Sequence, residues 1–302
     1  MVPVTGMALI DHKNVLKGLT VQEAMRRQII HLPVKALLEK AIRYTIKYKV
    51  NAILITTNQQ EALGVVSKTD LMGAYYAALP LETSVETIMI GPPLFCHADD
   101  SLDTALDLMR ANRVHRLYVQ GDKPDRAAGV LAYPDIVGLL YRYCHRCEKS
   151  LLLSRSKQKA IDLHDHYRVR EVMTPSVQAA SAEDSLLQVM EGLAASWIAA
   201  ILIRDSHELP VGVISKTDLI LAYIHGLPTT AAAKTIMVSP VQACDQQEIL
   251  PRAIKKMIFS DIHRMFVYKD HPQALVGVLS LSDAARFRSG TCRACLASRI
   301  KV

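Results

Sequence analysis

Gly64-Val-Val-Ser-Lys-Thr-Asp70-Leu71 recurs in this chain of 302 residues as Gly212-Val-Ile-Ser-Lys-Thr-Asp218-Leu219, which lies 148 positions downstream. The same offset relates Ala52-Ile-Leu-Ile55 to Ala200-Ile-Leu-Ile203, Thr87-Ile-Met89 to Thr235-Ile-Met237, and His115-Arg116 to His263-Arg264. No insertion or deletion interrupts the correspondence between about residue 21 and residue 295. Agreement over such a length indicates that a whole module has been duplicated.

Each half of the chain repeats again, less faithfully. Residues 64–70 match residues 129–135 at an offset of 65, and residues 21–25 match residues 85–89 at an offset of 64. The repeating unit is therefore about 65 residues long, and four units fill the chain. We expect a first module over residues 1–147, with units at about 17–79 and 80–147, and a second over 148–302, with units at about 165–227 and 228–295.

Hydrophobic periodicity predicts the elements of one unit. Leu38, Ala41 and Ile42 recur at helical spacing, and two short apolar runs at residues 52–55 and 64–66 flank a polar turn, as in a β-hairpin. A short strand before the first helix and a second helix after the hairpin complete a β-α-β-β-α unit. We predict an α/β fold in which two helices cover one face of a three-stranded sheet. Units then pair about a pseudo-twofold axis to bury the other face.

Composition excludes several classes of protein. The formal charge of +7 is spread over both halves, so no basic arm or basic domain favours a nucleic-acid partner. The longest apolar stretch, at about residues 199–203, is far shorter than the roughly 18 residues that a membrane span needs. The N-terminus lacks the pattern of a secretory signal. We therefore expect a cytoplasmic protein with no membrane partner.

The recurring motif resembles that of a known family. Gly-hydrophobic-hydrophobic-Ser-x-Thr/Ser-Asp closes the units, and Met173-Thr-Pro175 opens one of them, as in the cystathionine β-synthase (CBS) domain. Two CBS domains form a Bateman module, and this chain resembles two such modules over about residues 17–146 and 165–294. The fourth unit, with His263-Arg264 and then Gly277-Val-Leu-Ser-Leu-Ser-Asp283, is similar to the last repeat of the γ subunit of AMP-activated protein kinase.

This resemblance implies sites for an adenine nucleotide (AMP, ADP or ATP) between paired units. It implies that the motif aspartate takes the ribose hydroxyls, that the preceding hydroxyls line the sugar and phosphate, and that a His-Arg pair faces the phosphates. The chemistry is suitable, because a carboxylate accepts from two vicinal hydroxyls, and because arginine and helix N-termini bind phosphate oxygens. The candidates are Asp283, Ser280, Ser282, His263 and Arg264 in the fourth unit, Asp218, Ser215 and Thr217 in the third, Asp70, Ser67 and Thr69 in the first, and Asp135, His115 and Arg116 in the second.

The units diverge at these positions. The first and third carry Asn51-Ala52 and Ala199-Ala200 in place of the His-Arg pair, and the second carries Ala132-Tyr-Pro134 in place of the hydroxyls. Both features coincide around Asp283, which makes the fourth unit the strongest candidate. An alternative needs no ligand, because a serine followed by an aspartate is also a helix N-cap.

All six cysteines obey the 148-residue offset. Cys144-His-Arg-Cys147 and Cys292-Arg-Ala-Cys295 end the two modules, and two such pairs could bind zinc or an iron–sulfur cluster, act as redox dithiols, or serve no function on a duplicated terminal helix. The family resemblance does not supply these pairs. Cys96 and Cys244 follow apolar runs, so we expect buried, inert thiols there.

Two functions remain in competition. The first is a non-catalytic regulatory sensor that binds adenosine nucleotides and signals to a protein effector or through its own oligomer, for which we expect a homodimer. The alternative is a ligand-free CBS scaffold or dimerisation protein, with metal at the cysteine pairs as a clamp. We expect no enzyme, because neither a nucleophile–base pair nor a glycine-rich phosphate loop occurs in a suitable context.

Overall fold

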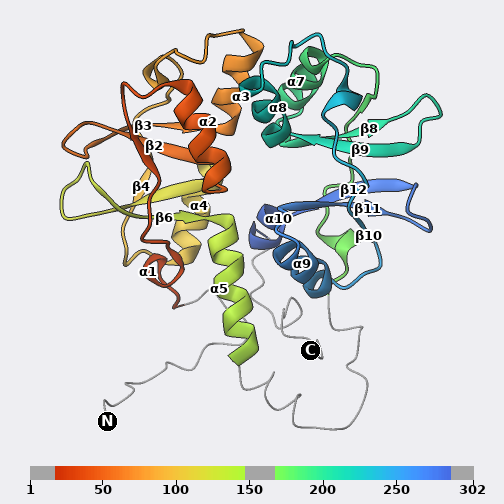
Figure 1. The fold of residues 1–302 in the computed structure, drawn as a ribbon. Coiled ribbons are helices and arrows are strands. Elements are labelled where there is room, and N and C mark those ends of the chain that lie inside the picture. Colours follow the sequence, from red (N-terminus) through yellow and green to blue (C-terminus); the bar gives the residue numbers. More distant parts are fainter. Residues whose placement is uncertain (1–17, 147–166, 287–302) are drawn as a thin grey trace.

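The computed structural model describes residues 18–146 and 167–286, which form four α/β units (Figure 1). The first unit contains β1 (His31–Pro33), α2 (Leu38–Lys47), β2 (Ala52–Thr56), β3 (Ala62–Ser67) and α3 (Lys68–Tyr76). The second contains β4 (Phe95–Cys96), α4 (Leu102–Ala111), β5 (Arg116–Gln120), β6 (Ala127–Ala132) and α5 (Tyr133–Arg146). The third contains β7 (Ala179–Ser181), α7 (Leu186–Ala195), β8 (Ala200–Arg204), β9 (Pro210–Ser215) and α8 (Lys216–Ile224). The fourth contains β10 (Ala243–Asp245), α9 (Leu250–Phe259), β11 (Arg264–Tyr268), β12 (Leu275–Ser280) and α10 (Leu281–Arg286).

Each unit has the predicted three-stranded sheet, in the order β1-β2-β3 and its equivalents. In the first unit β1 pairs parallel with β2, and β2 pairs antiparallel with β3 across the predicted hairpin. The parallel pair needs a crossover connection, and α2 provides it. The predicted β-α-β-β-α unit is therefore confirmed. Every helix in residues 18–146 and 167–286 is too short or too polar to traverse a bilayer.

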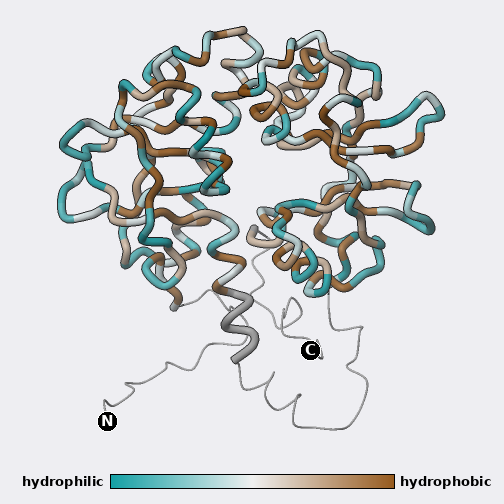
Figure 2. The backbone as a smooth tube through the Cα atoms, viewed as in Figure 1, coloured by the Kyte–Doolittle hydropathy of each residue, from teal (hydrophilic) through white to brown (hydrophobic). Residues whose placement is uncertain are grey.

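The second face of the sheet is buried between paired units, as predicted. Leu54 of the first unit packs with Tyr118 and Val130 of the second in a separate apolar cluster. In the second module Leu202 and Phe266, which follow Leu54 and Tyr118 by the same offset, are also buried. Figure 2 shows the hydrophobic strands enclosed within each module.

The two modules meet through helices, so that the first unit lies beside the third and the second beside the fourth (Figure 1). Helix α3 packs on α8, and α5 packs on α10. Between α3 and α8 the rings of Tyr75 and Tyr223 stack at 5.1 Å, and the Tyr75 hydroxyl donates to the Leu227 carbonyl at 2.8 Å. The two large apolar clusters each contain residues of both modules, which makes the module interface a continuous part of the core.

The opening segment of each unit packs on the other unit of its pair. Arg26, just after α1 (Val21–Ala24), exchanges two backbone hydrogen bonds of 2.9 Å with Val130 in β6. Ile90, which follows the short 3₁₀ helix Val85–Thr87, exchanges equivalent bonds with Val65 in β3. The opening residues of each sequence repeat therefore belong in space to the other unit of the pair, and we call them the exchanged segment.

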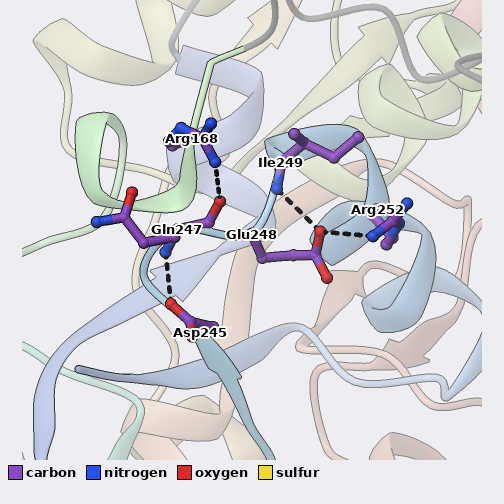
Figure 3. Close-up of polar contacts among 6 residues, drawn as sticks. All are labelled: Arg168, Asp245, Gln247, Glu248, Ile249 and Arg252. Carbon is purple, nitrogen blue, oxygen red and sulfur yellow. Dashed lines mark hydrogen bonds and ion pairs between the residues drawn. The ribbon is translucent and has the colours of Figure 1, made fainter. Parts of the chain in front are cut away.

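The second module shows the same exchange in its polar contacts (Figure 3). Arg168, at the start of the third unit, donates to the Gln247 carbonyl at 2.6 Å in the turn before α9 of the fourth unit. That turn is held by Asp245, which accepts from the Gln247 amide at 2.7 Å, and by Glu248, which pairs with Arg252 at 3.2 Å. The exchanged segment is thus fixed by side chains as well as by backbone pairing.

The motif glycine permits this close approach. A Cβ atom built on Gly277 would lie 2.7 Å from the Thr174 carbonyl oxygen and 2.8 Å from the Met173 sulfur, and Gly129 meets Met25 in the same way. Each of the four motif glycines therefore faces the methionine of an exchanged segment. The sequence shows both residues of the pair but not that they touch.

Gly277→Ala is expected to lower the free energy of unfolding by about 1–2 kcal/mol, because the new methyl group collides with backbone that cannot move aside freely. Gly73→Ala is the matched control, since Gly73 lies exposed in α3 with nothing within 4 Å of its Cβ position. That control should gain about 0.5–1 kcal/mol from helix propensity. Urea unfolding of both variants measures the difference, and equal changes in both would contradict the close approach.

Candidate functional site

The motif serine and aspartate form a helix N-cap in the first and third units. The amide and Oγ of Ser67 both donate to Asp70 Oδ2 at 2.7 Å at the start of α3. Ser215 and Asp218 repeat this arrangement at α8, with distances of 2.7 and 2.6 Å. The N-cap interpretation is therefore confirmed. Among the described residues no hydrogen bond reaches Oδ1 of either aspartate, so each carboxylate keeps an oxygen that can accept from a ligand.

The fourth unit brings together the residues predicted for its site. Ser280 donates to Asp283 Oδ2 through its amide at 2.9 Å and through its Oγ at 2.6 Å, and Ser282 Oγ lies 2.7 Å from Ser280 Oγ. Burial lowers the pKa of Arg264, and the nearby Asp283 carboxylate opposes this shift. Arg264 thus lies near Asp283 and the two hydroxyls, and such a set of groups can bind a sugar and a phosphate.

The candidate residues of the second unit are engaged by contacts within the first module. Asp135 accepts from the Ala132 amide at 2.9 Å through Oδ2 and from Arg26 Nε at 2.8 Å through Oδ1. Arg116 donates to the Ala52 carbonyl at 2.9 Å, and the His115 ring lies edge-on to Tyr133 at 5.7 Å. Both carboxylate oxygens of Asp135 are therefore engaged, whereas contacts within the described part of the chain reach only Oδ2 of the other three motif aspartates.

Arg26 stands at a position that differs in every unit. Its equivalents on the exchanged segments are Ile90, Thr174 and Val238. Each pairs through the backbone with the strand that leads into a motif helix, so each lies beside one motif. Ile90 and Val238 keep 66% and 55% of their surface exposed beside the first and third motifs. An exposed aliphatic side chain beside a polar motif is suited to one face of a planar base.

Two lysines that the sequence analysis missed cross the module boundary. Lys68 Nζ donates to Thr217 Oγ1 at 2.8 Å, and Lys216 Nζ donates to Thr69 Oγ1 at 2.8 Å. Both lysines stand between the serine and threonine of the motif. The signal was their recurrence at the 148-residue offset, while the second and fourth units carry Tyr133 and Leu281 there.

Cations from all four units gather where the modules meet. The pKa of Lys68 is lowered to about 8, mainly by burial and also by the nearby Arg116, although Asp218 opposes the shift. Burial and Arg264 likewise lower the pKa of Lys216. The pKa of His263 is lowered by burial and by Lys68 of the other module. A group of desolvated positive charges of this kind favours an anionic ligand.

Outside this region one ion pair also links the modules, between Lys49 and Asp261. Their positions are equivalent in the first and fourth units, and both residues adopt a positive φ in the turn before the second strand. The pair is exposed, so its contribution to stability is small. It shows that the first unit approaches the fourth as well as the third.

The cysteines divide into two groups. Cys96 and Cys244 are free and buried, which confirms the expected burial, and burial raises the pKa of each thiol to about 12. A thiol that stays protonated is a poor nucleophile, in agreement with the prediction of inert thiols. Cys144 lies in α5. Cys147, Cys292 and Cys295 lie outside the described residues, so the metal and redox hypotheses for these pairs stay predictions. Within the described ranges, no three His, Cys, Asp or Glu side chains are grouped as metal ligands.

Comparison with known proteins identifies the four units. The CBS domain family model matches residues 21–77, 85–142, 169–225 and 233–290. A Methanocaldococcus jannaschii protein, proposed as an archaeal homolog of g-AMPK, matches 89% of this chain and 99% of its own, with a TM-score of 0.74 and 15% identity. An uncharacterized conserved protein from Pyrococcus horikoshii matches 89% of this chain and 100% of its own, with a TM-score of 0.58 and 17% identity. No curated protein matches the chain.

At these identities the solved structures show a shared fold. The family model covers most of the chain, and its four segments coincide with the four units seen in the structure. The expected resemblance is confirmed on both grounds. The chain therefore belongs to the CBS domain family, with four CBS domains paired into two Bateman modules.

Proposed function

We propose that this chain is a non-catalytic regulatory sensor that binds adenosine nucleotides (AMP, ADP or ATP) and relays their binding to a protein effector or through its own homodimer. The observation that carries the proposal is the group of desolvated cations at the module interface, formed by Lys68, Arg116, Lys216 and Arg264. A phosphate chain neutralises such a group, whereas a neutral ligand does not.

The motifs supply the rest of a nucleotide site. Oδ1 of Asp70, Asp218 and Asp283 can accept from ribose hydroxyls, while Oδ2 remains in the N-cap. Exposed Ile90 and Val238 offer apolar surface to a base beside the first and third motifs. We infer three competent sites, at the first, third and fourth motifs, and a second motif whose aspartate is already neutralised by Arg26.

The relay follows from where the motifs lie. Helices α3 and α8 begin at the motif lysines and pack on each other across the module boundary. An anion bound at these helix starts therefore acts on the contact between the modules. A ligand shifts a conformational equilibrium only by binding its two states differently, and this contact is the element on which such a difference can act.

Asp283→Asn is expected to weaken ATP and AMP binding at the fourth site by about 10- to 100-fold, the loss of one or two hydrogen bonds to a charged acceptor. Asparagine still accepts from the Ser280 amide but cannot accept from ribose at its amino group. Isothermal titration and thermal shift measure the change. The matched control is Asp184→Asn, because Asp184 accepts from the Ser181 amide at 2.8 Å outside the motifs.

The ligand-free scaffold remains the competing function, and one observation favours it: the motif aspartates are already used as helix caps. If AMP, ADP and ATP leave the thermal midpoint unchanged at millimolar concentration, the sensor proposal is wrong. Elemental analysis of the untreated protein then tests whether metal at Cys144, Cys147, Cys292 and Cys295 clamps the scaffold.

A further inference from the structure

Lys68 and Lys216, the two motif lysines, are charged groups whose partial burial is unfavourable. Each ammonium is partly buried, and each hydrogen-bonds to a neutral threonine hydroxyl of the opposite module at 2.8 Å. Within residues 18–146 and 167–286, neither lysine forms an ion pair. A desolvated ammonium without a carboxylate partner costs stability, so its retention at both copies points to an anionic partner.

The charges around each lysine come from other segments of the chain. Lys68 faces Arg116 on β5, Asp218 on α8 and His263 just before β11. Lys216 faces Arg264 on β11 and Asp70 on α3. Each lysine therefore lies beside a guanidinium and beside the motif aspartate of the opposite module. Its own motif aspartate is not among the charges that shift its pKa.

We propose that Lys68 and Lys216 bind phosphate across the module boundary, Lys68 serving the ligand of the third motif and Lys216 that of the first. The inference rests on the proposed function for the nucleoside part of the ligand, and its phosphate part also holds for an inorganic polyphosphate. Each module then lacks a complete site without the other. Ligand binding and the packing of the two modules are coupled for that reason.

The exchange has a direct test in single-site chains. In the first chain, Asp283→Asn and Asp70→Asn leave the third motif with its aspartate intact. In the second chain, Asp283→Asn and Asp218→Asn leave the first motif with its aspartate intact. Lys68→Met should weaken ATP binding about 10-fold in the chain that keeps the third motif and by less than about 2-fold in the other. Lys216→Met should show the reverse. Lys68→Arg, which keeps the positive charge at this position, checks that the effect follows the charge.

Adenosine and inorganic triphosphate separate the two parts of the ligand. Adenosine affinity should change by less than about 2-fold in every lysine variant, because adenosine carries no phosphate. Triphosphate affinity of the otherwise unchanged chain should fall about 100-fold when both lysines are replaced. Two results would overturn the proposal that each lysine serves the opposite module. One is an effect of a lysine on the motif of its own module, and the other is an equal loss of affinity for adenosine and for ATP.

The failures of the two proposals are distinguishable. If triphosphate binds and depends on both lysines while adenosine and AMP do not bind, the phosphate site stands and the nucleotide sensor is wrong. If nucleotides bind but the lysine variants leave every affinity unchanged, the sensor stands and the exchange is wrong. Circular dichroism of Lys68→Gln and Lys216→Gln confirms folding with a second, polar replacement.

Discussion

Exchanging Arg26 and Thr174, as Arg26→Thr and Thr174→Arg, is expected to exchange the ligand competence of the second and fourth motifs. The two residues are equivalent by the 148-residue offset, and both pair through the backbone with the strand before a motif. In the native chain Arg26 forms an ion pair with Asp135, whereas Thr174 carries no charge and cannot form one with Asp283. An arginine at 174 should therefore reach Asp283.

Thr174→Arg should lower nucleotide affinity at the fourth site by about 10-fold, because the ligand must first break a partly buried ion pair of about 1–2 kcal/mol. Arg26→Thr should open the second site, with a weaker affinity since Ala132-Tyr-Pro134 offers it no hydroxyl before the aspartate except at Tyr133. The number of sites seen in isothermal titration, together with the affinity, measures both effects. Unchanged stoichiometry in both variants would contradict the role of Arg26.

Arg26→Thr also leaves Asp135 without its cation. The Asp135 side chain is only 10% exposed whereas that of Arg26 is 48% exposed, so we expect a loss of about 1–2 kcal/mol rather than that of a fully buried pair. Burial already raises the pKa of Asp135, and removing Arg26 raises it further. The deficit should thus shrink as the pH falls and Asp135 takes up a proton. Arg27→Thr, at an exposed neighbouring arginine, is the control.

Lys68→Met is expected to raise the free energy of unfolding of the ligand-free protein by about 2 kcal/mol at pH 7. The lowering of the Lys68 pKa from 10.5 to about 8 means that the folded state disfavours the charged form by about 3 kcal/mol. Replacing Lys68 relieves this cost, but it also removes the hydrogen bond to Thr217, which offsets about 1 kcal/mol of the increase in stability. A lysine with a purely structural role would instead lose stability on replacement.

The pH dependence of stability is a second test of whether charged Lys68 destabilises the folded state. Because the folded pKa of Lys68 lies below the unfolded value, the unfolded state binds more protons between about pH 8 and 10.5. The free energy of unfolding of the wild-type chain should therefore rise through that pH window relative to that of Lys68→Met. The two free energies should converge near pH 10.5. Urea unfolding at pH 7, 8, 9 and 10 measures this. A difference that does not change with pH would contradict the desolvation of Lys68.

The fold could be predicted from the sequence to a large extent. The helix and strand order, the N-cap at Ser67 and the pairing of units followed from short-range patterns and from repetition. The placement of the first unit beside the third did not, since it depends on which apolar helix faces meet across the modules. Nothing in the local pattern distinguishes the α3 face that packs on α8 from one that packs within its own module.

The candidate site was predictable only in part. The motif aspartates and hydroxyls were found because they recur in consecutive residues, as at Asp283. Arg26 was missed because its partner Asp135 lies 109 positions away and belongs to another unit. Lys68 was visible as a repeated residue, but its role depends on a threonine 149 positions away, and such long-range contacts have no signature in one sequence.

The exchanged opening segments also determine the order in which the chain can fold during synthesis. Residues 21–25 emerge early from the ribosome, yet the strand on which they dock, β6, ends only at Ala132. The first unit must likewise wait for residues 85–90 before its own sheet is covered. A single CBS domain is thus an incomplete intermediate, and the smallest segment in which every exchanged opening segment is docked is a whole module.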